Sequence, residues 1–141
     1  MNKGKHLLAL IPARGGSKRL PRKNILKLGA HPLIAWSIRA CQQSIYVDKI
    51  VVSTDDSEIE SVAERYSPDQ IIKRPEYLAT DSALSVDVSI HAIEQLKKQG
   101  EHYEWLLLAQ PTSPLRSVTD IDKAFELVVR KSAVAVIGVC E

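Results

Sequence analysis

Hydrophobic positions along the chain follow two periods, and these predict strands and helices in alternation. Short apolar runs, each stopped by proline, glycine or polar residues, predict strands over 6–11, 49–53, 70–73, 105–109 and 133–139. Apolar residues at helical spacing predict helices over 32–44, over 57–66, from 86 to near Gly100, and around Ile121 to Val128. The runs 105–109 and 133–139 are apolar throughout, which is typical of strands buried on both faces.

Five strands alternating with four helices predict a doubly wound α/β fold, in which helices cover both faces of a mostly parallel sheet. Ligand sites in such folds lie beyond the carboxyl ends of the strands. This rule selects the segments 12–27, 54–57, 74–85 and 110–116. The pattern stops on a strand without a following helix, so we expect a domain that is incomplete at its C-terminal end.

Composition narrows the class of protein. With 141 residues, 45% of them hydrophobic, the chain has the size of one domain. No apolar run reaches the length of a membrane span or of a signal-peptide core, so we expect a cytoplasmic protein without membrane contacts. The two cysteines and four histidines show no metal-ligand spacing, and we predict no metal ligand among the residues of this chain.

Charge is distributed unevenly. Residues 1–47 carry nine Lys or Arg and no acid, whereas residues 48–141 carry ten basic and seventeen acidic residues. Most of the early positive charge lies in the segment 11–24, I-P-A-R-G-G-S-K-R-L-P-R-K-N, directly after the first strand. Its paired glycines let backbone N–H groups approach an anion, and its Arg and Lys supply countercharge. We therefore predict a polyphosphate-binding loop, although the spacing is neither that of a Walker A loop nor G-x-G-x-x-G.

Two other interpretations of this basic loop are open. It could be a solvated basic surface, or it could bind nucleic acid. Residues 12–27 contain no aromatic side chain on which a base could stack, so we expect no nucleic-acid partner.

Four segments together carry a family resemblance. They are the basic loop 11–24, then V-V-S-T-D-D-S-E-I-E-S-V-A-E-R-Y (51–66), R-P-E-Y-L-A-T-D (74–81) and Q-P-T-S-P-L-R (110–116). In this order they resemble the N-acylneuraminate cytidylyltransferases, the CMP-sialic acid synthetases, and their pseudaminate- and legionaminate-activating relatives. The form of the basic loop favours the pseudaminate branch. The resemblance implies a Rossmann-like nucleotidyltransferase of the nucleotide-diphospho-sugar transferase type, with residues 1–141 as its nucleotide-binding domain.

The resemblance also implies a reaction. CMP would pass from CTP to a nine-carbon keto-acid (nonulosonic) sugar, with release of pyrophosphate and with Mg²⁺ as cofactor. Family members continue into a dimerisation insertion and a final segment with metal-binding aspartates, so the Mg²⁺ ligands are expected beyond Glu141 and a homodimer is expected of the full-length protein. The alternative is a catalytically inactive fragment that binds nucleotide.

Six positions match functional residues of the family, and two neighbouring loop residues, Gly15 and Lys18, are predicted to bind substrate with them. Arg14 and Lys23 match the residues that bind the triphosphate and are the predicted catalytic residues. The predicted substrate-binding residues are Gly15 and Lys18 in the same loop, Asn24 and Ser85 at the nucleotide, Arg74 near the cytosine and Gln110 facing the sugar.

Some of these residues have structural interpretations as well. Ser85 could be only the N-cap of the helix that follows, and Arg74 could be a surface residue. The acids Asp55 and Asp56 precede a helix, where carboxylates cap free N–H groups without any metal, and Ser57 with Glu60 predicts a capping box. We therefore predict that the two aspartates are structural.

Overall fold

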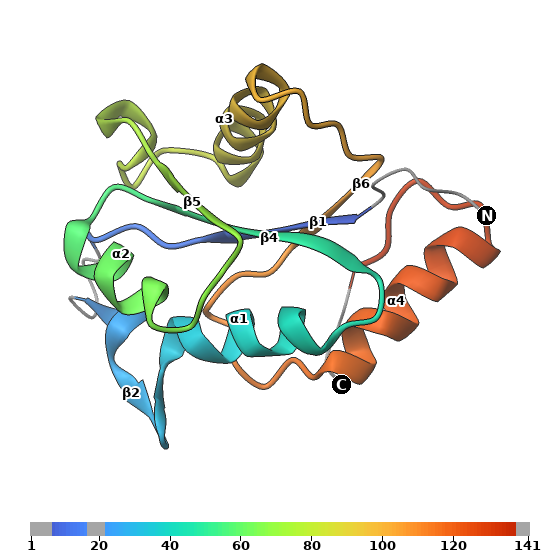
Figure 1. Cartoon of the computed structure of the whole chain (residues 1–141), viewed down its shortest axis with the longest axis horizontal. Helices are drawn as coiled ribbons and strands as arrows, with labels where there is room; N and C mark the ends of the chain where they lie inside the picture. Colours follow the sequence, from blue (N-terminus) through green and yellow to red (C-terminus); the bar gives the residue numbers. More distant parts are fainter. Residues whose placement is uncertain (1–6, 17–21, 138–141) are drawn as a thin grey trace.

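The structure, a computed structural model, describes residues 7–16 and 22–137 (Figure 1). His6, at the start of the first predicted strand, lies outside these residues. In chain order the elements are β1 (Leu7–Pro12), the 3₁₀ turn η1 (Lys23–Ile25), β2 (Lys27–Leu28), β3 (His31–Pro32), α1 (Leu33–Gln43), β4 (Val47–Thr54), α2 (Ser57–Glu64), β5 (Gln70–Lys73), the 3₁₀ turn η2 (Glu76–Leu78), α3 (Ser85–Lys98), β6 (Trp105–Leu108) and α4 (Val118–Arg130).

The main sheet has the strand order β5-β4-β1-β6, and every neighbouring pair in it is parallel. Strand β1 lies in the middle, where Ala9 pairs with Ile50 of β4 on one side and with Leu107 of β6 on the other. Because β1 is hydrogen-bonded on both sides and covered on both faces, five of its six residues are buried. Its unbroken apolar run is what such a strand requires.

Helices cover both faces of the sheet (Figure 1). On one face α1, α2 and α4 pack against side chains such as Ala9, Ile11 and Val52. On the other face α3 packs against Leu8 and Leu10 of the same strand β1. Successive side chains of β1 therefore point to opposite faces of the sheet and belong to two separate hydrophobic cores. The predicted doubly wound α/β fold is confirmed.

The sheet is narrower than the sequence suggests. Residues 133–137 form no strand, and Val134 and Ile137 are 94% and 82% exposed, so the predicted strand 133–139 is wrong over these residues, while 138 and 139 lie outside the described ranges. An apolar run becomes a strand only where a neighbouring strand accepts its hydrogen bonds. In the part of the chain that the structure describes, strand β6 is therefore the sheet edge and is not buried on both faces, with Leu106 37% exposed.

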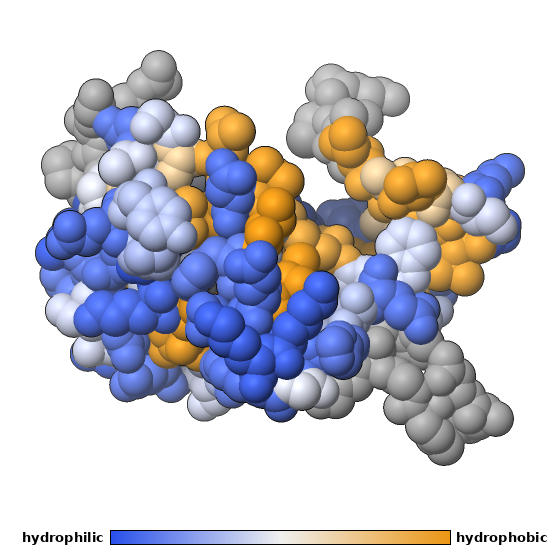
Figure 2. Space-filling view, turned by 90° about the horizontal axis from the view of Figure 1, so that it is seen from above, coloured by the Kyte–Doolittle hydropathy of each residue, from blue (hydrophilic) through white to orange (hydrophobic). Residues whose placement is uncertain are grey.

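Figure 2 shows apolar side chains gathered on the face seen from above, next to a polar surface.

The N-cap of helix α2 lies one residue before the predicted cap, Ser57. The side chain of Asp56 accepts hydrogen bonds from the N–H groups of Glu58 (2.9 Å) and Ile59 (3.0 Å), so Asp56 is the N-cap. The predicted capping box of Ser57 and Glu60 is therefore wrong. A carboxylate at this position also complements the positive end of the helix dipole.

The short hairpin of β2 and β3 was not predicted, because two-residue strands are too short to show a period. Gly29 makes its turn with φ of +68°, and Trp36 of α1 donates a hydrogen bond to the carbonyl of Leu28 (2.9 Å). The hairpin thereby joins the end of the basic segment to α1. Among the described residues no helix has the length and hydrophobicity of a membrane span.

Candidate functional site

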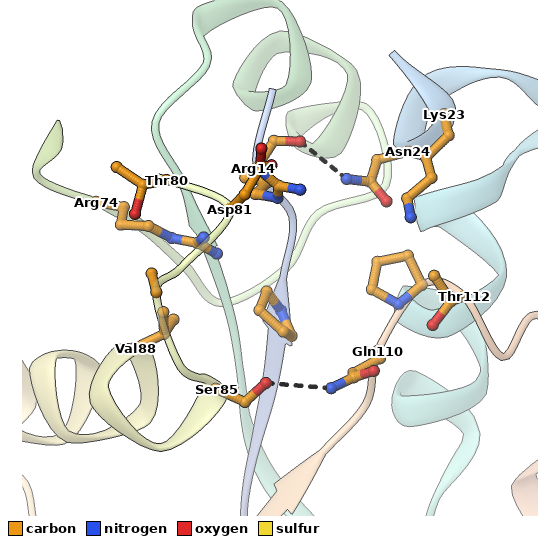
Figure 3. Close-up of a pocket in the computed structure, with 13 residues that line it drawn as sticks. Arg14, Lys23, Asn24, Arg74, Thr80, Asp81, Ser85, Val88, Gln110 and Thr112 are labelled. Carbon is orange, nitrogen blue, oxygen red and sulfur yellow. Dashed lines mark hydrogen bonds and ion pairs between the residues drawn. The ribbon is translucent and has the colours of Figure 1, made fainter. Parts of the chain in front are cut away.

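The carboxyl ends of the parallel strands share one edge of the sheet, and a pocket of about 170 Å³ lies there (Figure 3). Three of the four segments selected from the sequence line it: 12–27, 74–85 and 110–116. The lining residues are Pro12, Arg14, Lys23, Asn24, Arg74, Thr80, Asp81, Ala83, Ser85, Val88, Gln110, Pro111 and Thr112. Pockets for drug-sized ligands measure about 300–1,000 Å³, so this pocket is too small to enclose such a ligand completely.

Six of the eight residues chosen from the sequence line this pocket: Arg14, Lys23, Asn24, Arg74, Ser85 and Gln110. They come from three separate segments of the chain, and the parallel sheet brings them together. Lys18 lies outside the described residues. Gly15 does not line the pocket.

Gly15 attaches the basic loop to the segment that follows strand β4. Its N–H donates a hydrogen bond of 2.9 Å to Oδ1 of Asp55, which follows strand β4. This N–H is therefore engaged with the protein, contrary to the expectation that it faces an anion. The fourth selected segment, 54–57, thus acts on the site indirectly, by holding the loop that carries Arg14. Asp55 is not a helix cap.

Asp56 holds the other end of the same loop. Besides capping α2, its carboxylate forms an ion pair with Arg22, whose backbone has a φ of +59°. Partial burial acts to raise the pKa of Asp56, but the hydrogen bonds from Ile59 N–H and from Arg22 outweigh it and lower the pKa. The two adjacent aspartates therefore fix both ends of the segment 15–22.

Arg14 and Lys23 bring positive charge into the pocket. Arg14 follows β1 and forms an ion pair with Asp81, from the loop before α3 (Figure 3). Lys23 starts the turn η1 and is half-buried at the pocket wall. Together with Arg74 they place three cationic side chains against one carboxylate in the lining, which suits a polyanionic ligand.

Asn24 fixes the backbone beside Arg14. Its side chain is only 5% exposed, and Nδ2 donates a hydrogen bond of 3.0 Å to the carbonyl of Arg14. The amide oxygen and the second N–H have no partner among the described residues, so both can serve a ligand. Asn24 therefore combines a structural contact with capacity for binding.

Arg74 is buried and not a surface residue. Its guanidinium donates to the backbone carbonyls of Ser53 and Leu78, each at 3.2 Å, and to Oγ of Ser53 at 3.4 Å. Burial lowers the pKa of Arg74 and nearby Arg14 lowers it further, while the charge of Asp55 acts against both. Arg74 thus ties the end of β5 to β4 and also presents a cation to the pocket.

Ser85 and Gln110 face each other across the pocket. Nε2 of Gln110 donates to Oγ of Ser85 at 3.4 Å (Figure 3). The N-cap of α3 is Leu84, and Ser85 is the first helical residue. The interpretation of Ser85 as a mere cap is therefore wrong, since its hydroxyl points to a residue that follows the next strand.

The structure adds Thr80, Asp81 and Thr112 to the site. All three belong to segments that the strand-end rule selected, and Asp81 ends the R-P-E-Y-L-A-T-D segment, but their side chains carry no pattern that distinguishes them from other loop residues. Within residues 7–16 and 22–137, no group of three or more His, Cys, Asp or Glu side chains is placed to hold a metal ion.

Comparison with known proteins agrees with this geometry. A family model described as cytidylyltransferase matches residues 8–135. The N-acylneuraminate cytidylyltransferase of Escherichia coli O18:K1:H7 is 43% identical over 86% of this chain and 28% of its own length. The pseudaminic acid cytidylyltransferase of Campylobacter jejuni serotype O:23/36 is 39% identical over 89% of this chain and 54% of its own. The chain thus spans between about a quarter and about half of these relatives.

A solved structure shares the fold. The CMP:2-keto-3-deoxy-manno-octonic acid synthetase complexed with CTP superimposes with a TM-score of 0.72 at 23% identity, over 91% of this chain and 49% of that one. The nucleotidyltransferase-like architecture expected from the sequence is confirmed.

Proposed function

The chain belongs to the cytidylyltransferase family, and on this premise we propose that it provides the CTP-binding part of an enzyme that transfers CMP from CTP to a nonulosonic, sialic-acid-like sugar. One observation carries the proposal. Six residues from three separate segments line one strand-end pocket with an excess of positive charge. A triphosphate has the charge, and a nucleoside the hydrogen-bonding groups, that such a lining recognises.

The roles follow from the family resemblance, and the chemistry of the side chains is compatible with each. Arg14 offers a planar fork and Lys23 a point charge to the triphosphate, and each charged hydrogen bond contributes about 1.5–3 kcal/mol. Arg74, held rigidly by two carbonyls, lies toward the cytosine. Asn24 and Ser85 contact the nucleoside, and Gln110 faces the sugar.

The reaction needs one bond made and one broken. The anomeric hydroxyl oxygen of the sugar attacks the α-phosphorus of CTP and loses its proton, while the bond from that phosphorus to the bridging oxygen of the β-phosphate breaks. Pyrophosphate leaves in line. Arg14 and Lys23 contribute by holding the β- and γ-phosphates, where negative charge accumulates.

The described residues do not form a Mg²⁺ site of their own. Asp55 accepts from a backbone N–H, Asp56 caps α2, and Asp81 pairs with Arg14. We propose that Mg²⁺ is held mainly by the triphosphate, by water and by residues outside this chain.

These engaged carboxylates favour a second candidate function, a nucleotide-binding unit without turnover of its own. The nine-carbon sugar, a homodimer of the longer enzyme and a cytoplasmic location stay predictions. Identities of 43% and 39% do not separate the sialate from the pseudaminate branch.

Calorimetric titration with CTP tests the binding proposal. We expect Arg14→Ala and Lys23→Ala to weaken binding by about tenfold or more each, since each removes a charged hydrogen bond. Arg39→Ala, which removes an exposed cation on α1 outside the pocket, is the matched control and leaves affinity unchanged. Equal CTP affinity of all four proteins would show that the basic loop is only a solvated surface.

Pyrophosphate release from CTP separates the two functions. N-Acetylneuraminic and pseudaminic acid are supplied in turn, with Mg²⁺, to this chain alone and to a version extended by the C-terminal half of a relative. Turnover only in the extended protein supports the nucleotide-binding unit. Robust turnover of this chain that Asp55→Ala abolishes would make Asp55 part of the catalytic machinery.

A further inference from the structure

We propose that Asp81 is the counter-ion of Arg14 in the empty pocket and that it lowers the affinity of the site for polyphosphates. This inference rests on the proposed function, because it assumes that Arg14 binds the triphosphate. It adds a residue that sets how tightly substrate and product phosphates are held.

The geometry places the two side chains in direct contact. Nη1 of Arg14 forms an ion pair with Oδ1 of Asp81, and both residues line the pocket (Figure 3). Arg14 follows β1, whereas Asp81 lies on the loop between η2 and α3, so the pair joins two walls of the pocket. Their side chains are 32% and 40% exposed, which leaves the guanidinium within reach of an anion from solvent.

Asp81 differs from the other two aspartates near the site. Asp55 accepts from the backbone of Gly15 and Asp56 caps α2, and neither lines the pocket. Among the described residues that line the pocket, Asp81 is the single acid, and it engages a side chain that the proposed function assigns to the ligand.

A polyphosphate must therefore compete with Asp81. Its oxygens need the same guanidinium donors, and its charge is repelled by the carboxylate a few ångströms away. Ion pairs at this level of exposure are weak, so the ligand can displace the carboxylate at a modest cost in affinity. The same competition acts on pyrophosphate and favours its release, because the ion pair between Asp81 and Arg14 forms again when pyrophosphate leaves.

Calorimetry with inorganic pyrophosphate tests this inference. We expect Asp81→Asn to bind pyrophosphate about three- to tenfold more tightly, since the isosteric amide removes the competing charge. Asp81→Glu keeps the charge and should stay within about twofold of the parent. Glu76→Gln, an exposed acid on the same stretch that does not line the pocket, is the matched control and should change nothing.

The Arg14→Ala background separates this inference from the proposed function. If Asp81 acts through Arg14, the gain from Asp81→Asn largely disappears in that background. If Arg14→Ala itself binds pyrophosphate as tightly as the parent, the proposed function is wrong and the inference falls with it. If Arg14→Ala weakens binding but Asp81→Asn does not tighten it, the inference alone is overturned, and equal tightening by Asn and Glu overturns it as well.

Discussion

The N–H of Gly15 lies 2.9 Å from Oδ1 of Asp55, a hydrogen bond that joins the loop after β1 to the loop after β4. The contact requires a close approach of the two loops. A Cβ atom on residue 15 would lie 2.5 Å from Oδ2 and 2.8 Å from Cβ of the neighbouring Asp56. Glycine is therefore needed here to let the backbone approach the aspartates.

Replacement of Gly15 by alanine should destabilise the protein by about 1–3 kcal/mol, because the added methyl group overlaps backbone-proximal atoms of Asp56. CTP binding should weaken in parallel, since the loop carrying Arg14 shifts. Gly16→Ala is the matched control, because its Cβ would meet no atom of residues 7–16 and 22–137 within 4 Å beyond its chain neighbours. Urea unfolding measures both variants. Equal stability of the two would contradict the proposed close approach.

Arg74→Met should destabilise the protein by about 2–4 kcal/mol, since the carbonyls of Ser53 and Leu78 lose buried donors. Arg65→Met makes the same change at an exposed position at the end of α2 and should cost little. Chemical unfolding of the two variants provides the measurement. A tolerated Arg74→Met would mean that this guanidinium serves the ligand alone.

The contribution of Asp56 to stability should disappear in acid. Its pKa is lowered in the folded protein, so its stabilising effect is present above the ordinary aspartate value and is lost as the pH falls through the lower folded value. The parent should therefore be more stable than Asp56→Ala at pH 7, and the difference should shrink below about pH 4. Urea unfolding across this range tests it. A difference that stays constant down to pH 2 would assign the effect to packing.

The thiol of Cys41 should resist alkylation in the folded protein. Burial raises its pKa to about 12, against the opposing charge of Arg116, so almost no thiolate exists at pH 8. Peptide mapping after iodoacetamide treatment distinguishes Cys41 from Cys140, and urea-unfolded protein is the positive control. Rapid labelling of Cys41 without denaturant would contradict its burial.

Sequence periodicity located the main elements well because each depends on local information. The run 70–73 coincides with β5, and the helical stripe of Ile121 and Val128 lies on α4 with both residues buried. The strand predicted over 133–137 is wrong, because an apolar run needs a neighbouring strand to become one, and Val134 and Ile137 lie exposed instead. The observed N-cap of α2, Asp56, lies one residue before the predicted one, Ser57, because the choice between them depends on where the chain turns into the helix.

The sequence by itself determined which residues are candidates for an anion site. The basic residues of 11–24, the strand-end rule and the family resemblance led to six residues that line one pocket in the structure. This worked because parallel strands bring their carboxyl ends to one edge whatever the details of packing.

Only the tertiary structure decided how those groups are held. The sequence predicts Asp55 as a helix cap, yet its carboxylate accepts a hydrogen bond from Gly15 N–H, and Asp81, one of several loop carboxylates in the sequence, pairs with Arg14. These partners lie 40 and 67 residues apart in sequence. A carboxylate looks the same in every loop, and its role depends on which donor the folded chain brings within hydrogen-bond distance, which no local pattern encodes.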